Sequence, residues 1–264
     1  MHIAPISTIF LSPSTAKILT EKTPYHAWAY HYQLGNLSKP EQSDSALFGT
    51  CVDKLVFGVG PIISIRKPRE PKPDNDRFNI SVTDAMHRSA QDCAWSVLGF
   101  AKSHGIDLAG AQGQKQPRWR WQADGGVWCS GRPDWYTPGP EQDLIIDLKT
   151  SFQLGDKVIE RTVQAYGYDI QAASYLEAAD AIYGKNPKRN LRFLFVESKE
   201  PYLCRWVTLD SRCLGNGMAK WRKACAVWKD CLDSDAWPGY DDISISCPPW
   251  SMTKQEIDFD LEDK

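Results

Sequence analysis

The stretch that decides the fold is GRPDWYTPGPEQDLIIDLKTS, residues 131–151. Its Arg-Pro-Asp and Ile-Asp-Leu-Lys segments lie on either side of a Pro-Gly-Pro centre at 138–140. Apolar runs that flank a proline- and glycine-rich centre are typical of a strand, a tight turn and a second strand. We therefore predict a hairpin that brings Asp134 and Asp147 to neighbouring strands.

Side chains alternate between faces along a strand, so Asp147 and Lys149 share one face while Ile146 and Leu148 share the other. Two carboxylates and one ammonium at a strand end form a small site for a hard cation, because Mg²⁺ and Mn²⁺ prefer oxygen ligands. Beside such an ion, a lysine can orient an attacking water or help to deprotonate it. The combination indicates phosphodiester cleavage.

The alternative is a surface hairpin on which Asp147 and Lys149 form an ordinary exposed ion pair, which is common and weak. Asp147, however, lies inside the apolar run Leu-Ile-Ile-Asp-Leu at 144–148, which predicts a largely buried strand. A buried aspartate needs a compensating cation or metal. Burial therefore favours the site.

Length and composition limit the fold and the partners of the chain. Its 264 residues are enough for one sizeable core, or for one core and a small subdomain. Its net charge is −2, and it has eleven tryptophans. It is no polycation, so nucleic acid must be held by local basic patches or through bound metal. No apolar stretch approaches the roughly eighteen residues of a membrane span, and the N-terminus does not resemble a secretory signal. We expect a cytoplasmic protein with no membrane partner.

Eight cysteines are scattered along the chain without a Cys-x-x-Cys pair. Zinc and iron–sulfur sites normally use closely spaced pairs, so we predict buried free thiols. The alternative is a cluster of Cys225, Cys231 and Cys247.

Periodicity and turn residues predict one α/β domain with a helical N-terminal extension. We assign 1–105 to a mainly helical part, 106–235 to the catalytic core and 236–264 to an acidic tail. The predicted helices cover 12–31, 46–57, 82–104, 161–182 and 217–232. The predicted strands are a meander of 119–122, 127–136 and 144–150, and a pair of 191–197 and 202–209. Residues 61–79 are predicted as a basic extended loop.

One face of the predicted helix 161–182 carries Gln164, Tyr168, Gln171 and Tyr175 at i, i+4, i+7 and i+11. Beside the hairpin, such a stripe can contact phosphates or position the lysine. The alternative is a solvated amphipathic face, and proximity to the charged residues favours the site.

Three basic segments are candidate DNA contacts: 66–72, 115–120 with Trp119 and Trp121 interleaved, and 185–192. Arginine near tryptophan suits stacking on unpaired bases. A solvated charged surface is the alternative for each segment taken singly.

Arg-Pro-Asp, then Ile-Asp-Leu-Lys-Thr, then Tyr-x-x-Gln-x-x-x-Tyr at 168–175 resemble the PD-(D/E)XK nuclease superfamily. Within it, the chain resembles the exonuclease VIII (RecE) catalytic domain and related phage and prophage recombination exonucleases. Leu-Ser-Pro-Ser at 11–14 and Leu-Phe-Gly-Thr-Cys-Val-Asp at 47–53 resemble that family's opening helices. The resemblance spans about 11–180. It implies an α/β fold: a PD-(D/E)XK core, with a mixed central sheet flanked by helices, and a helical N-terminal extension.

The resemblance also implies residue roles. Asp134 and Asp147 would hold the metal, and Lys149 would orient the nucleophilic water or stabilise developing charge. Gln171 and Tyr175 would steady the lysine and the DNA strand.

Five candidate ligands for Mg²⁺ (or Mn²⁺) follow from the resemblance: Asp53, Gln116, Asp134, Asp147 and the Leu148 carbonyl. Asp53 stands where the family usually has a histidine, and it is also an oxygen ligand. Gln116 stands where the family tends to have a glutamate, and its amide supplies an oxygen but no charge. A second metal would then bind more weakly, which allows single-metal chemistry or reduced activity.

We therefore predict a Mg²⁺-dependent DNA exonuclease that degrades linear duplex 5′→3′ and leaves 3′ single-stranded tails for recombination. The expected partners are linear duplex ends, a single-strand annealing protein and further subunits in a homo-oligomeric ring. One alternative is a structure-specific or restriction-like endonuclease of the same superfamily. The other is a catalytically degenerate DNA-binding protein.

Overall fold

The computed structural model describes residues 8–35, 37, 42–67, 70–71, 75–76, 78–140 and 143–251. Its centre is a five-stranded sheet in the order β3-β6-β7-β8-β9. The strands are β3 (Gln114–Lys115), β6 (Trp135–Thr137), β7 (Asp143–Ser151), β8 (Arg189–Glu197) and β9 (Cys204–Val207). The sheet is mixed, because β7 runs antiparallel to β6 and parallel to β8.

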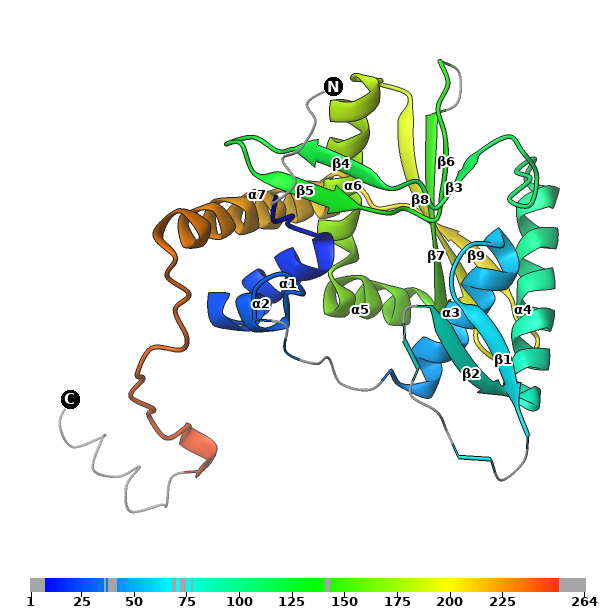
Figure 1. Ribbon diagram of the computed structural model, residues 1–264, viewed down its shortest axis with the longest axis horizontal. Coiled ribbons are helices and arrows are strands. Elements are labelled where there is room, and N and C mark those ends of the chain that lie inside the picture. The colour runs from blue at the N-terminus through cyan, green and yellow to red at the C-terminus, as the bar shows by residue number, and fades with distance from the viewer. Residues whose placement is uncertain are drawn as a thin grey trace.

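Helices cover both faces of this sheet (Figure 1). On the first side lie α5 (Asp156–Tyr166) and α6 (Tyr168–Tyr183), of which α6 contacts β8, and behind α6 lie α1 (Pro13–Glu21), α2 (Pro24–Tyr30) and α7 (Ser211–Ser234), which pack against α6 or against one another. The second face carries α3 (Asp44–Phe57) and α4 (Asp84–Ser103). Two small sheets complete the structure: β1 (Ile62–Arg66) with β2 (Asn79–Thr83), and β4 (Trp119–Gln122) with β5 (Trp128–Gly131).

The predicted hairpin is present. β6 and β7 pair antiparallel with Trp135 opposite Ile146, and Asp134 directly precedes β6. β7 is buried over its first five residues, because Ile145 packs into the core of the first face while Leu144 and Ile146 pack into the core of the second.

Two predicted helices are each broken in two. The helix expected over 12–31 ends at Glu21 and restarts at Pro24, because proline is favoured at the start of a helix but not inside it. The helix expected over 161–182 ends at Gly167, which adopts a left-handed conformation with φ 66°. Glycine takes this conformation without steric cost, and α6 starts at the next residue in a new direction.

The predicted extended loop over 61–79 was wrong at both ends. Residues 62–66 form β1, which pairs in parallel with β2. The three isoleucines in β1 favour a strand, and they precede the prolines on which the loop prediction rested. Residues 68–69, 72–74 and 77 lie outside the described residues.

The strand predicted over 127–136 is also two strands, β5 and β6, which belong to different sheets. The chain leaves β5 at Arg132 and Pro133, where proline has no N–H to donate to a ladder. This break frees the segment before β6 to bring Asp134 to the end of the sheet.

The eight cysteines are free; Cys225 and Cys231 are buried while Cys247 is exposed, so they do not form the alternative cluster. No helix in the described ranges is long and apolar enough to cross a membrane. After α7 the chain first contacts α7 and α2 through Trp237, Pro238 and Tyr240, and then extends away from the helices (Figure 1). Residues 252–264 of the predicted acidic tail lie outside the described residues.

Candidate active site

A cleft of about 1020 Å³ opens at the carboxyl end of β7. Elements from both faces of the sheet line it, among them α3, the segment before β6, α5 and α6. The lining includes seven of the eight residues to which the sequence assigns a catalytic or ligand role: Asp53, Asp134, Asp147, Leu148, Lys149, Gln171 and Tyr175. The eighth, Gln116, is not in the lining and is hydrogen-bonded to Asp53.

Asp134 is fixed to β7 through the backbone. The Leu148 N–H donates to Asp134 Oδ2 at 2.7 Å, so this bond places the carboxylate beside Leu148, the residue between Asp147 and Lys149. The hairpin pairing sets this register, which is why the sequence spacing predicts the meeting of the two aspartates.

Asp147 is held from two sides. It is 2 % exposed, forms an ion pair with Lys149 through Oδ2, and accepts a hydrogen bond from Gln171 Nε2 at 3.2 Å through Oδ1. Gln171 Nε2 also donates to the Tyr175 hydroxyl at 3.1 Å, and that hydroxyl donates to the Arg132 carbonyl at 3.0 Å. α6 thus orients Asp147 and anchors the segment that carries Asp134.

α3 reaches the site from the other face. A Cβ at Gly49 would lie 3.0 Å from the Thr150 side-chain oxygen, so this glycine lets the helix approach β7 closely. One turn further along α3, Asp53 Oδ2 accepts a hydrogen bond from Gln116 Nε2.

Gln116 is tied to the site by its backbone as well as by its amide. Its N–H donates to the Asp134 carbonyl at 2.9 Å, and it is 5 % exposed. Its φ of 46° is left-handed, an uncommon and strained conformation for a residue other than glycine. The fold places this side chain between Asp53 and the start of the Asp134 segment.

The carboxylates repel one another. Burial raises the pKa of Asp53 to about 6; the Gln116 hydrogen bond opposes the shift and the charge of Asp147 adds to it. Burial, together with the charges of Asp147 and Asp53, holds the pKa of Asp134 well above its usual range. Both shifts arise first from burial and then from neighbouring carboxylates, whose effect the chain's own cations only partly offset.

Lys149 is charged. Burial alone would lower the pKa of its ammonium, but Asp147, Tyr168 and Asp134 together outweigh burial and raise the pKa. The ammonium also lies 4.4 Å from the centroid of the Tyr168 ring, within cation–π range.

The residues present fit a hard divalent cation by their donor chemistry. Asp53 Oδ1 and Gln116 Oε1 are buried and have no hydrogen-bond partner in the described part of the chain, and oxygen is the ligand that Mg²⁺ and Mn²⁺ prefer. In the same part of the chain, no three His, Cys, Asp or Glu side chains are arranged as a ready-made centre. Asp147, for example, contacts Lys149 and Gln171 instead, so a cation there would compete with those N–H donors.

Three of the four residues of the predicted helical stripe line the cleft, and one does not. Gln164 lies on α5, where its amide bonds Cys213 Sγ and its oxygen accepts from Lys220 Nζ of α7. The break at Gly167 turns it away, while Tyr168, Gln171 and Tyr175 line the cleft.

Two of the predicted DNA-contact segments are partly buried. Trp119 and Trp121 are each 3 % exposed, and their N–H groups donate to Tyr183 and Glu177, so their faces are closed to bases. In the segment 185–192, Arg189 is enclosed in ion pairs with Asp143, at 2.8 Å, and with Asp180.

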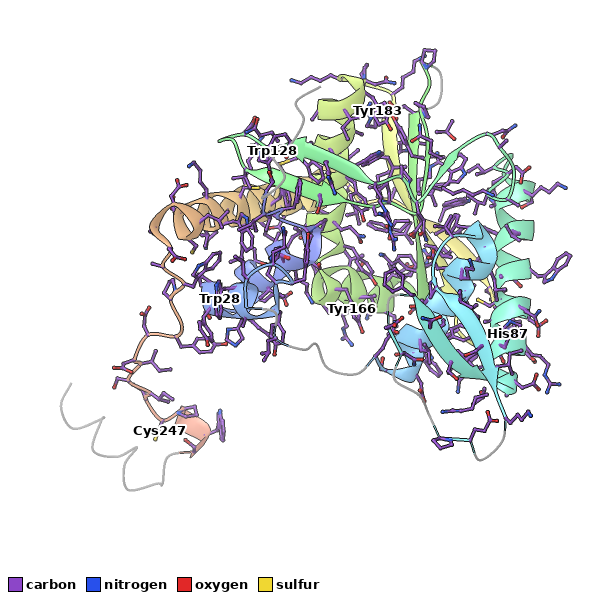
Figure 2. All side chains as sticks on the ribbon, in the orientation of Figure 1. Trp28, His87, Trp128, Tyr166, Tyr183 and Cys247 are labelled. Carbon is purple, nitrogen blue, oxygen red and sulfur yellow. The ribbon has the colours of Figure 1, made fainter. Side chains whose placement is uncertain are left out.

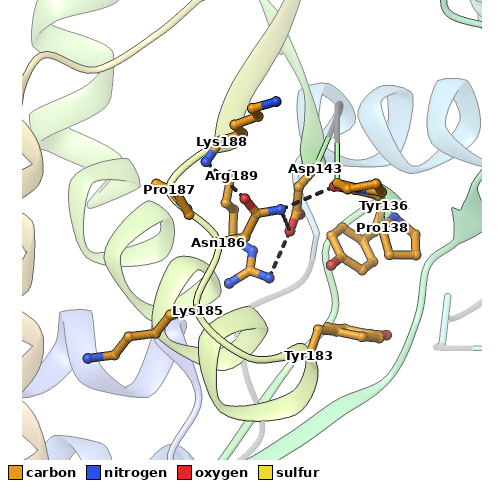
Figure 3. A pocket seen from close by; sticks show the side chains of 11 residues that line it. Tyr136, Pro138, Asp143, Tyr183, Lys185, Asn186, Pro187, Lys188 and Arg189 are labelled. Carbon is orange, nitrogen blue, oxygen red and sulfur yellow. Dashed lines mark hydrogen bonds and ion pairs between the residues drawn. The ribbon is translucent and has the colours of Figure 1, made fainter.

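Arg189 belongs to a smaller pocket, of about 490 Å³, beside the turn between β6 and β7 (Figure 3). Asn186 donates to Asp143 at 3.1 Å, and burial together with Asp143 raises the pKa of Tyr136 to about 12. The buried charges here pair within the chain, which is typical of a structural network.

Sequence reasoning missed two aromatic residues of the large cleft, Phe152 and Tyr166, which are 65 % and 63 % exposed. Phe152 directly follows β7, and Tyr166 is the last residue of α5. Their positions just outside the predicted motifs were the available signal.

The chain is similar to known proteins. The sequence model of a family described as "PDDEXK-like domain of unknown function (DUF3799)" matches residues 75–247, more than half of the chain. No curated protein matches.

Two solved structures are similar. A chain from Eubacterium rectale, named as a candidate exonuclease, has a TM-score of 0.55 at 17% identity, with 89% of this chain and 91% of that chain covered. A phage-related exonuclease from Haemophilus somnus 129PT has a TM-score of 0.40 at 13% identity, with 87% and 97% covered. The first similarity supports the fold.

Proposed function

The chain belongs to the PDDEXK-like domain family, and on this premise we propose that it is a divalent-metal-dependent nuclease that degrades linear double-stranded DNA from an end. The α/β fold and the resemblance to the PD-(D/E)XK superfamily are confirmed. The observation that carries the proposal is the meeting of Asp134, Asp147 and Lys149 in one cleft at the end of β7.

Asp134 and Asp147 would hold the cation, with Asp53, the Gln116 amide oxygen and the Leu148 carbonyl as further ligands. The chemistry that a bound Mg²⁺ or Mn²⁺ supplies is activation of a water and compensation of charge on the phosphorus.

The chain's own residues support the attack. Because its pKa is raised, Lys149 stays protonated at neutral pH, so we assign it to orienting the water and to stabilising charge on the phosphate oxygens, not to removing a proton. Gln171 keeps Asp147 oriented, and Tyr175 keeps the Arg132–Asp134 segment in place.

The finer assignment rests on the resemblance to exonuclease VIII. We propose 5′→3′ digestion that leaves 3′ single-stranded tails for recombination, in concert with an annealing protein and within a ring of subunits.

Linear duplex labelled separately at its 5′ and 3′ ends tests the proposal. With Mg²⁺, we expect the 5′ label to be released first and covalently closed circular duplex to stay intact. Cutting of the circle would favour the restriction-like endonuclease. Binding of DNA without any cleavage in Mg²⁺ or Mn²⁺ would favour the degenerate DNA-binding protein.

A further inference from the structure

The wall of the cleft carries a stack of aromatic rings that runs from the core to solvent. The Phe193 ring is fully buried, and the Tyr168 ring stacks on it at 5.5 Å with an interplanar angle of 29°. The Tyr166 ring stacks on Tyr168 at 5.8 Å and 21°. The last ring, Tyr166 (Figure 2), is 63 % exposed, so the stack ends at the surface.

The break between α5 and α6 produces this arrangement. Tyr166 and Tyr168 flank Gly167, whose left-handed backbone lets two nearby residues of separate helices present parallel rings. In one continuous helix, residues two apart would point to different sides.

A second exposed ring lines the same cleft. Phe152 is 65 % exposed and lies three residues beyond Lys149, about 10 Å along an extended chain. Exposed aromatic residues are common on proteins, so exposure by itself decides nothing. What distinguishes this pair is that both rings line the cleft that holds Asp147 and Lys149.

Cations accompany both rings. Lys199 Nζ lies 5.6 Å from the Phe152 centroid, and Lys17 Nζ lies 5.7 Å from the Tyr166 centroid. Aromatic faces with lysines beside them are the combination that binds unpaired nucleic acid, because bases stack on rings while ammonium groups meet phosphates. In a duplex, base faces are covered by neighbouring pairs, and only base edges are accessible.

We propose that Phe152 and Tyr166 stack on the bases of an unpaired DNA strand, so that the cleft receives DNA as a single strand next to the Asp147–Lys149 floor. The inference deepens the proposed nuclease function and rests on it for the identity of the ligand as DNA. Lys17 and Lys199 would move from the rings to the phosphates of that strand.

Binding of a short fluorescein-labelled single strand to the full chain, followed by anisotropy in Ca²⁺, tests this. Phe152→Ala and Tyr166→Leu should each weaken binding by roughly tenfold. Tyr166→Phe, which keeps the ring, should bind as the wild type does. The matched control is Trp95→Ala, because Trp95 is 78 % exposed on α4 away from this cleft and should leave affinity unchanged.

An abasic strand separates stacking from other causes. The wild type should bind the abasic strand about as weakly as Tyr166→Leu binds the normal strand, and the substitutions should lower affinity for the abasic strand little further. The proposal is overturned if the substitutions lower affinity equally for the normal and the abasic strand, or if they do not lower affinity for the normal strand. Cleavage is measured separately, so a chain that stacks bases without hydrolysing DNA would refute the nuclease function and leave the stacking surface standing.

Discussion

β7 carries two buried aspartates, one at its first residue and one at its centre, and the two differ in what surrounds them. At its start, Asp143 pairs with Arg189, and the side chains of both are 3 % exposed (Figure 3). At its centre, Asp147 shares a cleft with Asp134 and Asp53, and among the described residues only Lys149 forms an ion pair with it.

The difference is one of charge: Asp143 has a cation of the chain beside it, whereas the carboxylates of the cleft outnumber theirs, and at both places some buried polar atoms, such as Asp143 Oδ1 and Asp53 Oδ1, have no hydrogen-bond partner in the described part of the chain. Arg189 neutralises Asp143, and Asn186 satisfies it further. The three carboxylates of the cleft exceed the cations in contact with them, and burial, with the charges of the neighbouring carboxylates, raises the pKa of Asp53 and of Asp134. Buried carboxylates are costly unless a cation compensates them, so the fold maintains the cleft at a cost in stability.

The largest effect is expected from Asp147→Asn. The variant keeps the shape of the side chain but removes the charge between Lys149 and the proposed cation. We expect cleavage of labelled linear DNA to fall by at least about a thousandfold, while urea unfolding changes little. Normal cleavage by this variant would refute the active-site assignment.

Arg189→Met should lower stability and leave cleavage intact, the opposite of what we expect for Asp147→Asn. It leaves Asp143 buried without its cation, so we expect the free energy of unfolding to fall by about 3–5 kcal/mol. Urea denaturation measures this, and cleavage per folded molecule should persist. Asp180→Asn is the matched control, because Asp180 contacts the same arginine but its side chain is 42% exposed, so the loss should stay below about 1 kcal/mol. A stable but inactive Arg189→Met variant would show that the Asp143–Arg189 pair takes part in cleavage and is not purely structural.

Gln171→Ala should reduce turnover by about tenfold to a hundredfold, because Asp147 loses the donor that orients it. Stability should change by less than about 1 kcal/mol. Gln164→Ala serves as the control, because Gln164 bonds α7 and should not affect turnover. Equal losses in both variants would argue against orientation of Asp147 as the cause.

The smallest effect concerns pH and Asp53. Its pKa of about 6 lies above the 3.8 of an unfolded aspartate, so the folded chain keeps a proton that the unfolded chain releases between these values. The stability from this proton is complete below pH 3.8 and is lost as pH rises through 6. Asp53→Asn should therefore stabilise the metal-free protein at both pH values, by about 1 kcal/mol more at pH 8 than at pH 5. Urea unfolding in EDTA measures both values, and an equal gain at both would contradict the shift.

Local sequence predicted the part of the site that lies on the hairpin. Strand alternation places Asp147 and Lys149 on one face, and the Pro-Gly-Pro turn sets the pairing that brings Asp134 to them. These inferences succeed because they depend only on neighbours in the chain.

The parts of the fold and of the site that the sequence did not predict depend on long-range packing or on single backbone angles. Nothing near Arg189 in sequence reveals that Asp143 neutralises it, so a buried structural residue was predicted as a DNA contact. A glycine is tolerated inside a helix, and the break at Gly167 therefore had no clear local signal. The left-handed φ of Gln116, a residue that bonds both Asp53 and Asp134, is a conformation that no propensity of glutamine encodes.

Gly167 divides the lining of the cleft between two helices with different roles. α6 orients Asp147, while α5 contributes Val158, Thr162 and Tyr166 to the lining. For protein engineering, we expect substitutions at these three positions to change which ligands enter the cleft, provided that Ile159 and Val163 still fill the core.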